Sequence, residues 1–331
     1  MKIVGIAFDL RKDFEGLDLG KVPDDRLEEY DSEETVQAIA VALTSLGYVP
    51  RLLGGGRGFI EKVLREPPDL VFNIAEGFGT RSREAHVPAV CEMLRIPCTH
   101  SDPLTAALTL DKGLAKQVVA AAGVATPKSV TVTSSVFDAS ALSFPVIAKP
   151  SFEGSSMGVR RRSRVTQPSD LRAVVEEMLG DYRQPVLIEE FQTGPELTVG
   201  ILGNGDRARV IASMEITPTH GNPSEFVYGI EAKRNYKVEV AYHVPPRLPP
   251  AEIARAESLA LAAYRALGCR DVGRVDVRFG GDGAPRFIEV NPLPGLNPVT
   301  GDLCILSGRI GMEYPALIGA IVDEARRRTA P

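Results

Sequence analysis

Cysteine is scarce in this sequence, and its four copies follow no recognisable ligand pattern. They form no Cys-x-x-Cys pair and have no histidine at the spacing of a zinc ligand: Cys91, Cys98, Cys269 and Cys304. This distribution argues against a zinc site. It predicts reduced structural thiols, which are typical of proteins in the cytoplasm.

The sequence also lacks a long apolar run and an excess of positive charge. No segment approaches the roughly 20 apolar residues that a membrane-spanning helix requires. Residues 1–8 lack the long apolar core and the small-residue cleavage site of a signal peptide, so we interpret them as a buried strand. The formal net charge of −5 gives no polycationic signature. We therefore expect neither a membrane nor a nucleic acid as a partner.

The remaining composition is that of an ordinary α/β protein, with 44% hydrophobic and 24% charged residues. A chain of 331 residues is too long for one small core, which predicts two or three domains. In the first 100 residues apolar strands alternate with helices, with strands at 1–8, 49–53 and 70–74 and helices at 32–46 and 59–65. This alternation predicts a parallel sheet covered on both faces.

Beyond residue 100 the pattern predicts a long helix at 105–122 and then strands of a mixed sheet, at 129–132, 146–149, 159–165 and 185–190. Further helices are expected at 171–179, 251–267 and 314–328. Joints are expected near residue 100 and near Gln184. They divide the chain into three predicted domains, 1–100, 101–184 and 185–331.

The most informative segment is a predicted hairpin at residues 274–291. Two runs rich in β-branched and aromatic residues flank a Gly-Asp-Gly turn. Alternate residues of a strand share a face, which groups Arg274, Asp276 and Arg278 on one strand and Phe287, Glu289 and Asn291 on the other. Asp276, Glu289 and Asn291 would then converge and offer oxygen ligands, which suit Mg²⁺ bound with a nucleotide's phosphates. A surface hairpin of alternating charge is the alternative.

A second motif is a lysine that ends a strand and enters a loop of small residues. Lys149 ends the apolar run 146–149, and the loop 150–158 contains two glycines and three serines. Such a loop lets backbone N–H groups and hydroxyls approach an anion closely, and the lysine adds a positive charge. A plain hairpin turn is the alternative, although a turn does not need Lys-Pro before it.

A third motif places carboxylates at the edge of an apolar strand. Glu189 and Glu190 follow the apolar residues 186–188, and Glu196 begins the next apolar run. Carboxylates and polar backbone at such an edge can bind the amino group of adenine and the hydroxyls of ribose. Acids at strand ends are equally common on protein surfaces, so this motif alone leaves both interpretations open.

In this order the three motifs resemble the ATP-grasp superfamily, and within it the D-alanine–D-alanine ligase family. The resemblance extends from about Cys91 to Ala325, and the segment Leu110–Lys116 resembles the start of the family's central domain. It implies the mixed α/β ATP-grasp fold. In that fold an N-terminal parallel α/β domain (1–100) precedes a central subdomain with a mobile loop (101–184) and a C-terminal subdomain with the metal and catalytic residues (185–331).

The resemblance implies ATP and two Mg²⁺ ions as cofactors, with Mn²⁺ as a second candidate ion. The metal ions would be held by Asp276, Glu289 and Asn291. Ten residues would contact the nucleotide: Lys112, Lys149, Glu153, Ser155, Ser156, Glu189, Glu190, Gln192, Glu196 and Lys233. Among them the three lysines would bind the phosphates, and the four residues from Glu189 to Glu196 would lie at the adenine and the ribose.

The implied reaction joins a carboxylate to an amine through an acyl phosphate. Arg274 and the backbone of Gly295 would stabilise the tetrahedral intermediate, and Ser155 would help to position the substrate. A closed loop would exclude water, which would otherwise hydrolyse the acyl phosphate. The resemblance further implies amino-acid substrates and a cytoplasmic homodimer.

The sequence departs from the family at the positions that bind the substrate. A longer segment, 9–31, replaces the family's turn after the first strand, and Glu28 is the best candidate for the carboxylate that meets the first substrate's ammonium group. Asp31 and Glu34 are alternatives, although both also fit a capping box at the start of the helix at 32–46.

Three further substrate positions differ in side chain. Glu76 lies in a segment that replaces a His-Gly motif, Arg234 replaces a tyrosine, and Thr300 replaces a serine. The added arginine favours a more acidic substrate. D-alanyl-D-alanine is the favoured single product. The alternatives are other amino-acid pairs in a secondary pathway, phosphotransfer without amide formation, and a non-ligating ATP-binding protein.

Overall fold

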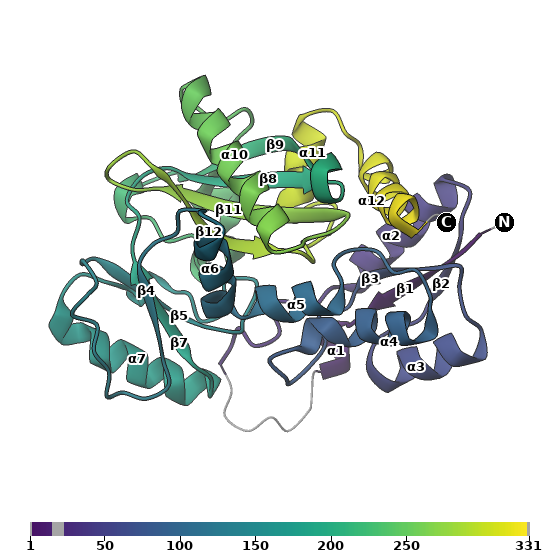
Figure 1. The fold of residues 1–331 in the computed structure, drawn as a ribbon, viewed down its shortest axis with the longest axis horizontal. Coiled ribbons are helices and arrows are strands. Elements are labelled where there is room, and N and C mark those ends of the chain that lie inside the picture. The colour runs from purple at the N-terminus through teal and green to yellow at the C-terminus, as the bar shows by residue number, and fades with distance from the viewer. Residues whose placement is uncertain (1, 15–22, 330–331) are drawn as a thin grey trace.

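The computed structural model describes residues 2–14 and 23–329, which form three β-sheets with helices packed on them (Figure 1). The first sheet is parallel, with strand order β2-β1-β3, and comprises β1 (Ile3–Phe8), β2 (Val49–Leu52) and β3 (Leu70–Ile74). Its neighbours are α1 (Arg11–Phe14), α2 (Glu33–Ser45), α3 (Gly56–Arg65) and α4 (His86–Leu94).

The first sheet is covered on both faces, as predicted. Leu70 and Phe72 face a core that includes Ile39 of α2, whereas Val71 faces a second core that includes Phe59 of α3. Because alternate residues of β3 enter different cores, the whole strand is buried and its sequence is a continuous apolar run.

The second sheet is antiparallel throughout, with strand order β4-β7-β5-β6, so the prediction of a mixed sheet is wrong. Its strands are β4 (Ser129–Val132), β5 (Val146–Pro150), β6 (Arg164–Val165) and β7 (Val186–Glu190), and α7 (Pro168–Tyr182) packs against it. The strand predicted at 159–165 is reduced to the two residues of β6, because residues 161–163 form a 3-10 turn.

The third sheet is antiparallel, with strand order β10-β9-β8-β11-β12. Its strands are β8 (Glu196–Leu202), β9 (Arg209–Pro218), β10 (Val240–His243), β11 (Val272–Phe279) and β12 (Pro285–Asn291). The accompanying helices are α8 (Ile230–Arg234), α9 (Tyr236–Glu239), α10 (Pro250–Ala266), α11 (Asp302–Arg309) and α12 (Tyr314–Thr329).

The helix predicted at 105–122 is two helices, α5 (Pro103–Leu110) and α6 (Lys112–Ala121). Asp111 separates them with an extended backbone and caps α6, where its Oδ1 accepts a hydrogen bond from the N–H of Leu114 at 3.1 Å. Aspartate side chains compete for backbone N–H groups and so favour helix starts over helix interiors. The break places Lys112 at the first position of α6.

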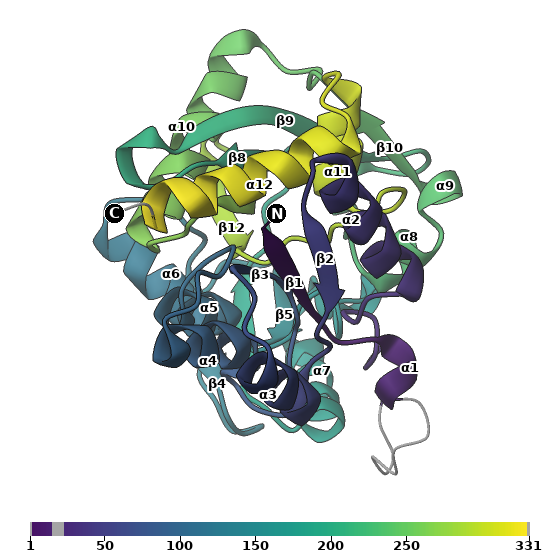
Figure 2. The ribbon, with the colours of Figure 1, turned by 90° about the vertical axis from the view of Figure 1, so that its right-hand side faces the viewer.

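The C-terminal helix belongs to the core of the N-terminal sheet. Ile321 of α12 shares a core with Ile6 of β1, Ile39 of α2 and Val272 of β11. Helix α12 packs against α2 (Figure 2). The domain limits at residues 100 and 184 stay a proposal. Strand β7, which pairs with β4 and β5, follows the proposed limit at residue 184.

Among residues 2–14 and 23–329, no helix by itself is long and apolar enough to cross a membrane. Only α11 and α12 taken together meet the length and composition criteria, and a bend of 110° separates them. The four cysteines are buried and unbonded to one another.

A buried ion pair fastens α12 to the body of the protein. Arg328 contacts both carboxylate oxygens of Asp271, at 2.9 and 3.0 Å, and also donates to the backbone carbonyls of Cys98 and His100. Asp271 is fully buried. A single guanidinium therefore connects the third sheet, the C-terminal helix and the end of the N-terminal region.

We predict that Arg328→Met lowers the free energy of unfolding by about 3 kcal/mol, because it leaves a buried carboxylate without its partner. Urea denaturation followed by circular dichroism would measure the change. Arg326→Met is the matched control, with an expected loss of at most about 1 kcal/mol, because this exposed arginine of α12 contacts the hydroxyl of Tyr48 and, among the described residues, no buried carboxylate. Equal losses in the two variants would show that the buried pair of Arg328 with Asp271 stabilises the protein no more than an exposed contact does.

Candidate active site

Two adjoining cavities lie between the sheets. The larger, of about 480 Å³, is called the substrate cavity here, and the smaller, of about 90 Å³, is called the nucleotide cavity. Six residues line both: Lys112, Glu153, Tyr228, Lys233, Arg274 and Glu289. The site residues predicted from the sequence line at least one of the two cavities, except Glu34, one of the two alternatives to Glu28.

The hairpin of β11 and β12 contributes charged side chains where the two cavities adjoin. Asp276 lies opposite Glu289 and Arg274 lies opposite Asn291, as the alternation of side chains predicted. Phe287 is an exception, since it is fully buried in the core instead of sharing the face of Glu289. A β-bulge at this point pairs Val277 with Phe287 and leaves Ile288 as the extra residue, which reverses the alternation.

The residues proposed as metal ligands form a compact set of oxygen donors. Asp276 accepts hydrogen bonds from the hydroxyl of Thr198 and from Arg274, the latter at 3.0 Å, and its Oδ2 lies 3.4 Å from the amide nitrogen of Asn291. Burial raises the pKa of Glu289, but Lys112 and the other nearby cations outweigh burial and lower it to about 2. Glu289 is therefore ionised at neutral pH.

This donor set fits Mg²⁺, which prefers one or two carboxylates together with phosphate oxygens and water. Within the described part of the chain, no group of three His, Cys, Asp or Glu side chains is arranged to hold a metal ion. The protein would thus supply two carboxylates and one amide, and a nucleotide would supply the remaining ligands.

Lys149, for which the resemblance implies phosphate binding, shares a buried carboxylate with Lys116. The carboxylate of Glu189 lies 2.5 Å from Lys149 Nζ and 2.6 Å from Lys116 Nζ. All three side chains are almost completely buried. Burial alone would raise the pKa of Glu189, but the two ammonium groups lower it.

The geometry makes Glu189 a counter-ion beneath Lys149, which differs from the adenine contact expected from the sequence. Lys116 was not among the residues predicted for the site. Its position four residues after Lys112, on the same face of α6, was the available signal.

The far end of the nucleotide cavity has an apolar wall. It is built by Ile147, Phe191 and Val227, which pack together in one cluster. The guanidinium of Arg278 lies 4.4 Å from the centre of the Phe191 ring and 3.2 Å from the carboxylate of Glu196. A flat aromatic base fits such a wall, and polar groups lie at its edge.

The two other polar residues at this edge are engaged with the protein backbone. The amide of Gln192 donates to the carbonyl of Glu190 at 2.9 Å, and the Glu190 carboxylate accepts from the N–H of Ser143 at 2.9 Å.

The loop predicted to bind phosphate closes over the junction of the cavities. Lys112 donates to the carbonyl of Glu153, and Ser156 donates to the carbonyl of Tyr228 at 3.0 Å. Ser155 and Ser156 both have positive φ angles, 48° and 61°, in the left-handed region that non-glycine residues seldom adopt. Ser155 lines the substrate cavity, and Ser156 lines the nucleotide cavity.

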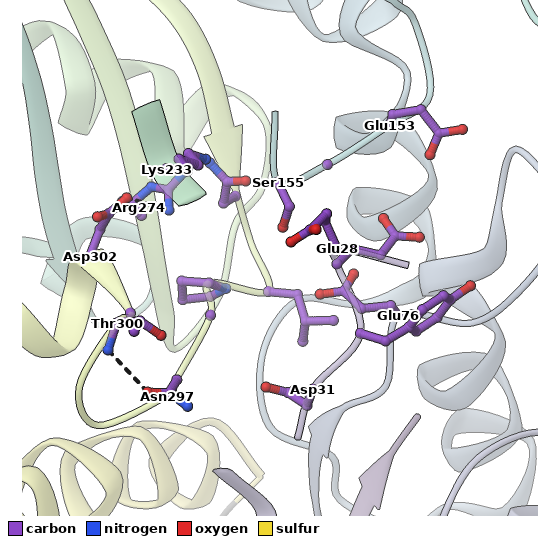
Figure 3. Close-up of a pocket in the computed structure, with 18 of the residues that line it drawn as sticks. Glu28, Asp31, Glu76, Glu153, Ser155, Lys233, Arg274, Asn297, Thr300 and Asp302 are labelled. Carbon is purple, nitrogen blue, oxygen red and sulfur yellow. Dashed lines mark hydrogen bonds and ion pairs between the residues drawn. The ribbon is translucent and has the colours of Figure 1, made fainter. Parts of the chain in front are cut away.

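Arg274 lines both cavities, and Figure 3 shows it beside Lys233 and Asp302. Its guanidinium contacts Asp276 at 3.0 Å and Asp302 at 3.3 Å, and its Nε is buried without a partner among the described residues. Burial lowers the pKa of the nearby ammonium of Lys233, and the positive charge of Arg274 lowers it further. Both cations face a space in which an anion would be stabilised.

Gly295 and Thr300 lie on the loop that follows β12 and line the substrate cavity. The backbone N–H of Thr300 donates to the side chain of Asn297 at 3.0 Å (Figure 3). Asp302, at the start of α11, also lines this cavity and accepts a hydrogen bond from Tyr228 at 3.2 Å. Asp302 was not predicted from the sequence, because its contact with Arg274 depends on the path of this loop.

Glu28 and Arg234, both predicted to bind the substrate, bind each other. Arg234 contacts Glu28 at 2.8 Å and Asp24 at 2.6 Å, and Arg11 contacts Glu28 at 3.0 Å. The guanidinium of Arg234 is thus neutralised within the protein. The expectation of a more acidic substrate, which depended on this arginine, loses its support.

Two other acids, Asp31 and Glu76, line the substrate cavity near Glu28 (Figure 3). Ser32 occupies the N-cap position of α2, so the predicted capping box with Asp31 as the cap is wrong. Burial raises the pKa of Asp31 to about 7, with Thr35 lowering it and Asp9 raising it. Burial and then the neighbouring acids raise the pKa of Glu76 well above its ordinary value.

The three sheets and the paired cavities define a class of protein, the ATP-grasp enzymes. The chain is similar to a D-alanine–D-alanine ligase from Bacillus anthracis solved in complex with ATP, with a TM-score of 0.74 over 99% of this chain and 98% of that one. The sequences are 22% identical, so this likeness establishes the fold alone.

Sequence comparison identifies the family. The family described as the D-Ala-D-Ala ligase C-terminus matches residues 117–323. A D-alanine–D-alanine ligase from Moorella thermoacetica is 31% identical over 87% of this chain and 92% of its own length. Another from Desulforudis audaxviator is 33% identical over 88% and 92%. The chain belongs to the D-alanine–D-alanine ligase family of ATP-grasp ligases.

We predict that Glu189→Gln lowers the free energy of unfolding by about 3 kcal/mol, because two buried ammonium groups then lack their shared carboxylate. Urea denaturation measures this loss, and Glu176→Gln on the exposed face of α7 is the control with almost no expected change. Unchanged stability in the Glu189 variant would mean that Lys116 and Lys149 are adequately solvated without it.

Proposed function

We propose that this protein is an ATP-dependent carboxylate–amine ligase that joins two amino acids through an acyl phosphate. The observation that carries the proposal is the junction of the two cavities, which Lys112, Lys233 and Arg274 border on both sides. A phosphoryl group held in one cavity would meet, at this junction, a carboxylate held in the other.

ATP would occupy the nucleotide cavity with its adenine against the wall around Phe191. Glu190 and the backbone near Gln192 would contact the adenine edge, and Glu196 would contact the ribose. Lys149 and Lys112 would bind phosphate oxygens, with Glu189 fixing the position of Lys149. Positively charged groups held in place before the reaction stabilise developing charge without reorganisation.

Asp276, Glu289 and Asn291 would hold two Mg²⁺ ions, or Mn²⁺, which would neutralise the phosphate charge and orient the γ-phosphate. Among the described residues, the low pKa of Glu289 and the convergence of these three side chains support this role.

In the first step the carboxylate of one amino acid would attack the γ-phosphorus of ATP and form an acyl phosphate, with ADP as the leaving group. In the second step the amine of the other amino acid would attack the acyl carbon. Arg274 and the N–H of Gly295 would stabilise the tetrahedral oxyanion. Collapse of this intermediate would release phosphate and leave the amide.

The loop with Glu153, Ser155 and Ser156 would exclude water from the acyl phosphate, and Ser155 would position the substrate. Its hydrogen bonds to Lys112 and to the backbone of Tyr228 hold it over the junction. A loop that opens less readily would protect the intermediate for longer.

D-alanyl-D-alanine is the single product that the named relatives favour. The substrate residues Glu28, Glu76, Arg234 and Thr300 differ from the family pattern, so other amino-acid pairs are the main alternative. We include in the proposal a homodimer in the cytoplasm with no nucleic-acid or membrane partner.

The test is ADP release by the purified protein with Mg-ATP, screened against single amino acids and pairs, with products identified by mass spectrometry. We expect turnover that requires two amino acids and a product mass equal to their sum less one water. Tight ATP binding without turnover for any amino-acid combination would instead favour a non-ligating ATP-binding protein.

We predict that Asn291→Ala lowers kcat by at least about 100-fold, because one metal ligand and one orienting contact to Asp276 are lost. Metal titrations should also require more Mg²⁺ for half-maximal rate, and the unfolding midpoint should stay near that of the parent protein. Asn222→Ala, which removes an exposed asparagine at the start of a 3-10 turn after β9, is a control for general loss of an amide. Normal turnover in the Asn291 variant would remove this residue from the metal site.

A further inference from the structure

The substrate cavity holds more negative charge near its N-terminal wall than the neighbouring cations balance. Arg83 contacts Glu29 at 2.8 Å and Glu153 at 3.1 Å, and Glu28 is paired with Arg234. Three other carboxylates line this cavity and have no ion pair with any described residue: Asp31, Glu76 and Glu84.

Of these three acids, Glu84 is the most clearly buried without a partner among the described residues. Its side chain belongs to a 3-10 turn at residues 83–85, is only 8% exposed, and makes no hydrogen bond to a described residue. The adjacent Arg83 does not pair with it, because the Arg83 guanidinium donates to Glu29 and to the backbone carbonyl of Phe152 at 2.8 Å. A buried carboxylate without a partner is costly unless a ligand supplies the missing charge.

The pKa values of the three acids agree with this unbalanced charge. Burial raises the pKa of Glu84 to about 7, with Arg83 lowering it and Glu29 raising it. Asp31 is also raised to a pKa of about 7, and Glu76 well above its ordinary value. A cation bound beside these acids would lower their pKa values again.

The opposite wall of the same cavity carries two basic side chains, Lys233 and Arg274, beside Asp302. Lys233 and Arg274 lie on one side of the view in Figure 3, and Glu28, Asp31 and Glu76 lie on the other. A substrate carboxylate that reacts beside Arg274 would therefore direct the rest of its molecule toward the acids.

We propose that the amino acid whose carboxylate is activated carries a second cationic group, on its side chain, which Glu84 and Glu76 bind. The inference rests on the ligase function proposed above. The α-ammonium group would neutralise only one of the three carboxylates, and a basic side chain would neutralise a second. An organic ammonium or guanidinium group also donates several hydrogen bonds, which suits carboxylates that come from different segments.

The test compares lysine with norleucine, which has the same carbon chain but no side-chain amine, in both D and L forms. We expect kcat/KM for the preferred enantiomer of lysine to exceed that for norleucine by at least about 30-fold, as for a charge-assisted hydrogen bond in a buried site. Calorimetric titration of each amino acid into the protein with Mg-ADP should give the same order of affinity.

Glu84→Gln should reduce this lysine-to-norleucine ratio to less than about 5-fold. Glu92→Gln, on the exposed face of α4, should keep the ratio of the parent protein. If the Glu84 variant does not fold, the comparison of lysine with norleucine in the parent protein still decides the matter.

Equal kcat/KM and equal affinity for lysine and norleucine would overturn the inference and leave the ligase proposal intact. Failure of every amino-acid pair to be ligated would overturn the ligase proposal. In that case the calorimetric comparison of the two amino acids would still test the cationic subsite by itself.

Discussion

The bulged hairpin of β11 and β12 is the constraint on which the rest of the site depends. The bulge at Ile288 lets Phe287 enter the core while Glu289, two residues later, faces Asp276 across the sheet. In a regular strand Phe287 and Glu289 would lie on the same face, so burying the aromatic ring would also bury the carboxylate. The bulge therefore allows both the burial of Phe287 in the core and the placement of Glu289 beside Asp276.

The sign of the charged side chains changes from the nucleotide cavity to the far wall of the substrate cavity. Lys116 and Lys149 share one buried carboxylate, so together they leave an excess of positive charge for phosphates. Arg274 lies between two aspartates at the junction, and the acids near Glu84 follow at the far wall. In the proposed mechanism this order would separate an anion-binding end from a cation-binding end across the two adjoining cavities.

The segment at 23–31 connects this substrate end to the phosphate loop. Asp25 is fully buried and accepts hydrogen bonds from the N–H of Gly158 at 3.0 Å and from the hydroxyl of Tyr182 at 2.7 Å. Asp24 contacts Arg160 and Arg234. The segment that departs from the family pattern therefore also holds the phosphate loop and α8 together.

Much of the fold could be predicted from the sequence, because apolar periodicity and turn residues are local properties. The strand Leu70–Ile74 and the hairpin around Gly283 are examples, and both have the predicted bounds within a few residues. Predictions failed where a single polar side chain interrupts a regular pattern. Asp111 divides a continuous helical pattern into two helices by capping the second.

The positions of the site residues could also be predicted, since motif order brings them to the same cavities. Their pairings could not, because ion pairs depend on segments distant in sequence. Glu28 and Arg234 are 206 residues apart and neutralise each other, and Glu189 is held by lysines from two other elements. Charge balance of this kind becomes visible only when the three sheets are assembled.

We propose that a substrate carboxylate is activated as an acyl phosphate. An amino acid labelled with ¹⁸O in its carboxylate would test this step, with the label followed during ligation by mass spectrometry of the released phosphate. Activation through an acyl phosphate should transfer one ¹⁸O atom per turnover to inorganic phosphate. Product formation with no label in phosphate, or with label in AMP, would contradict it.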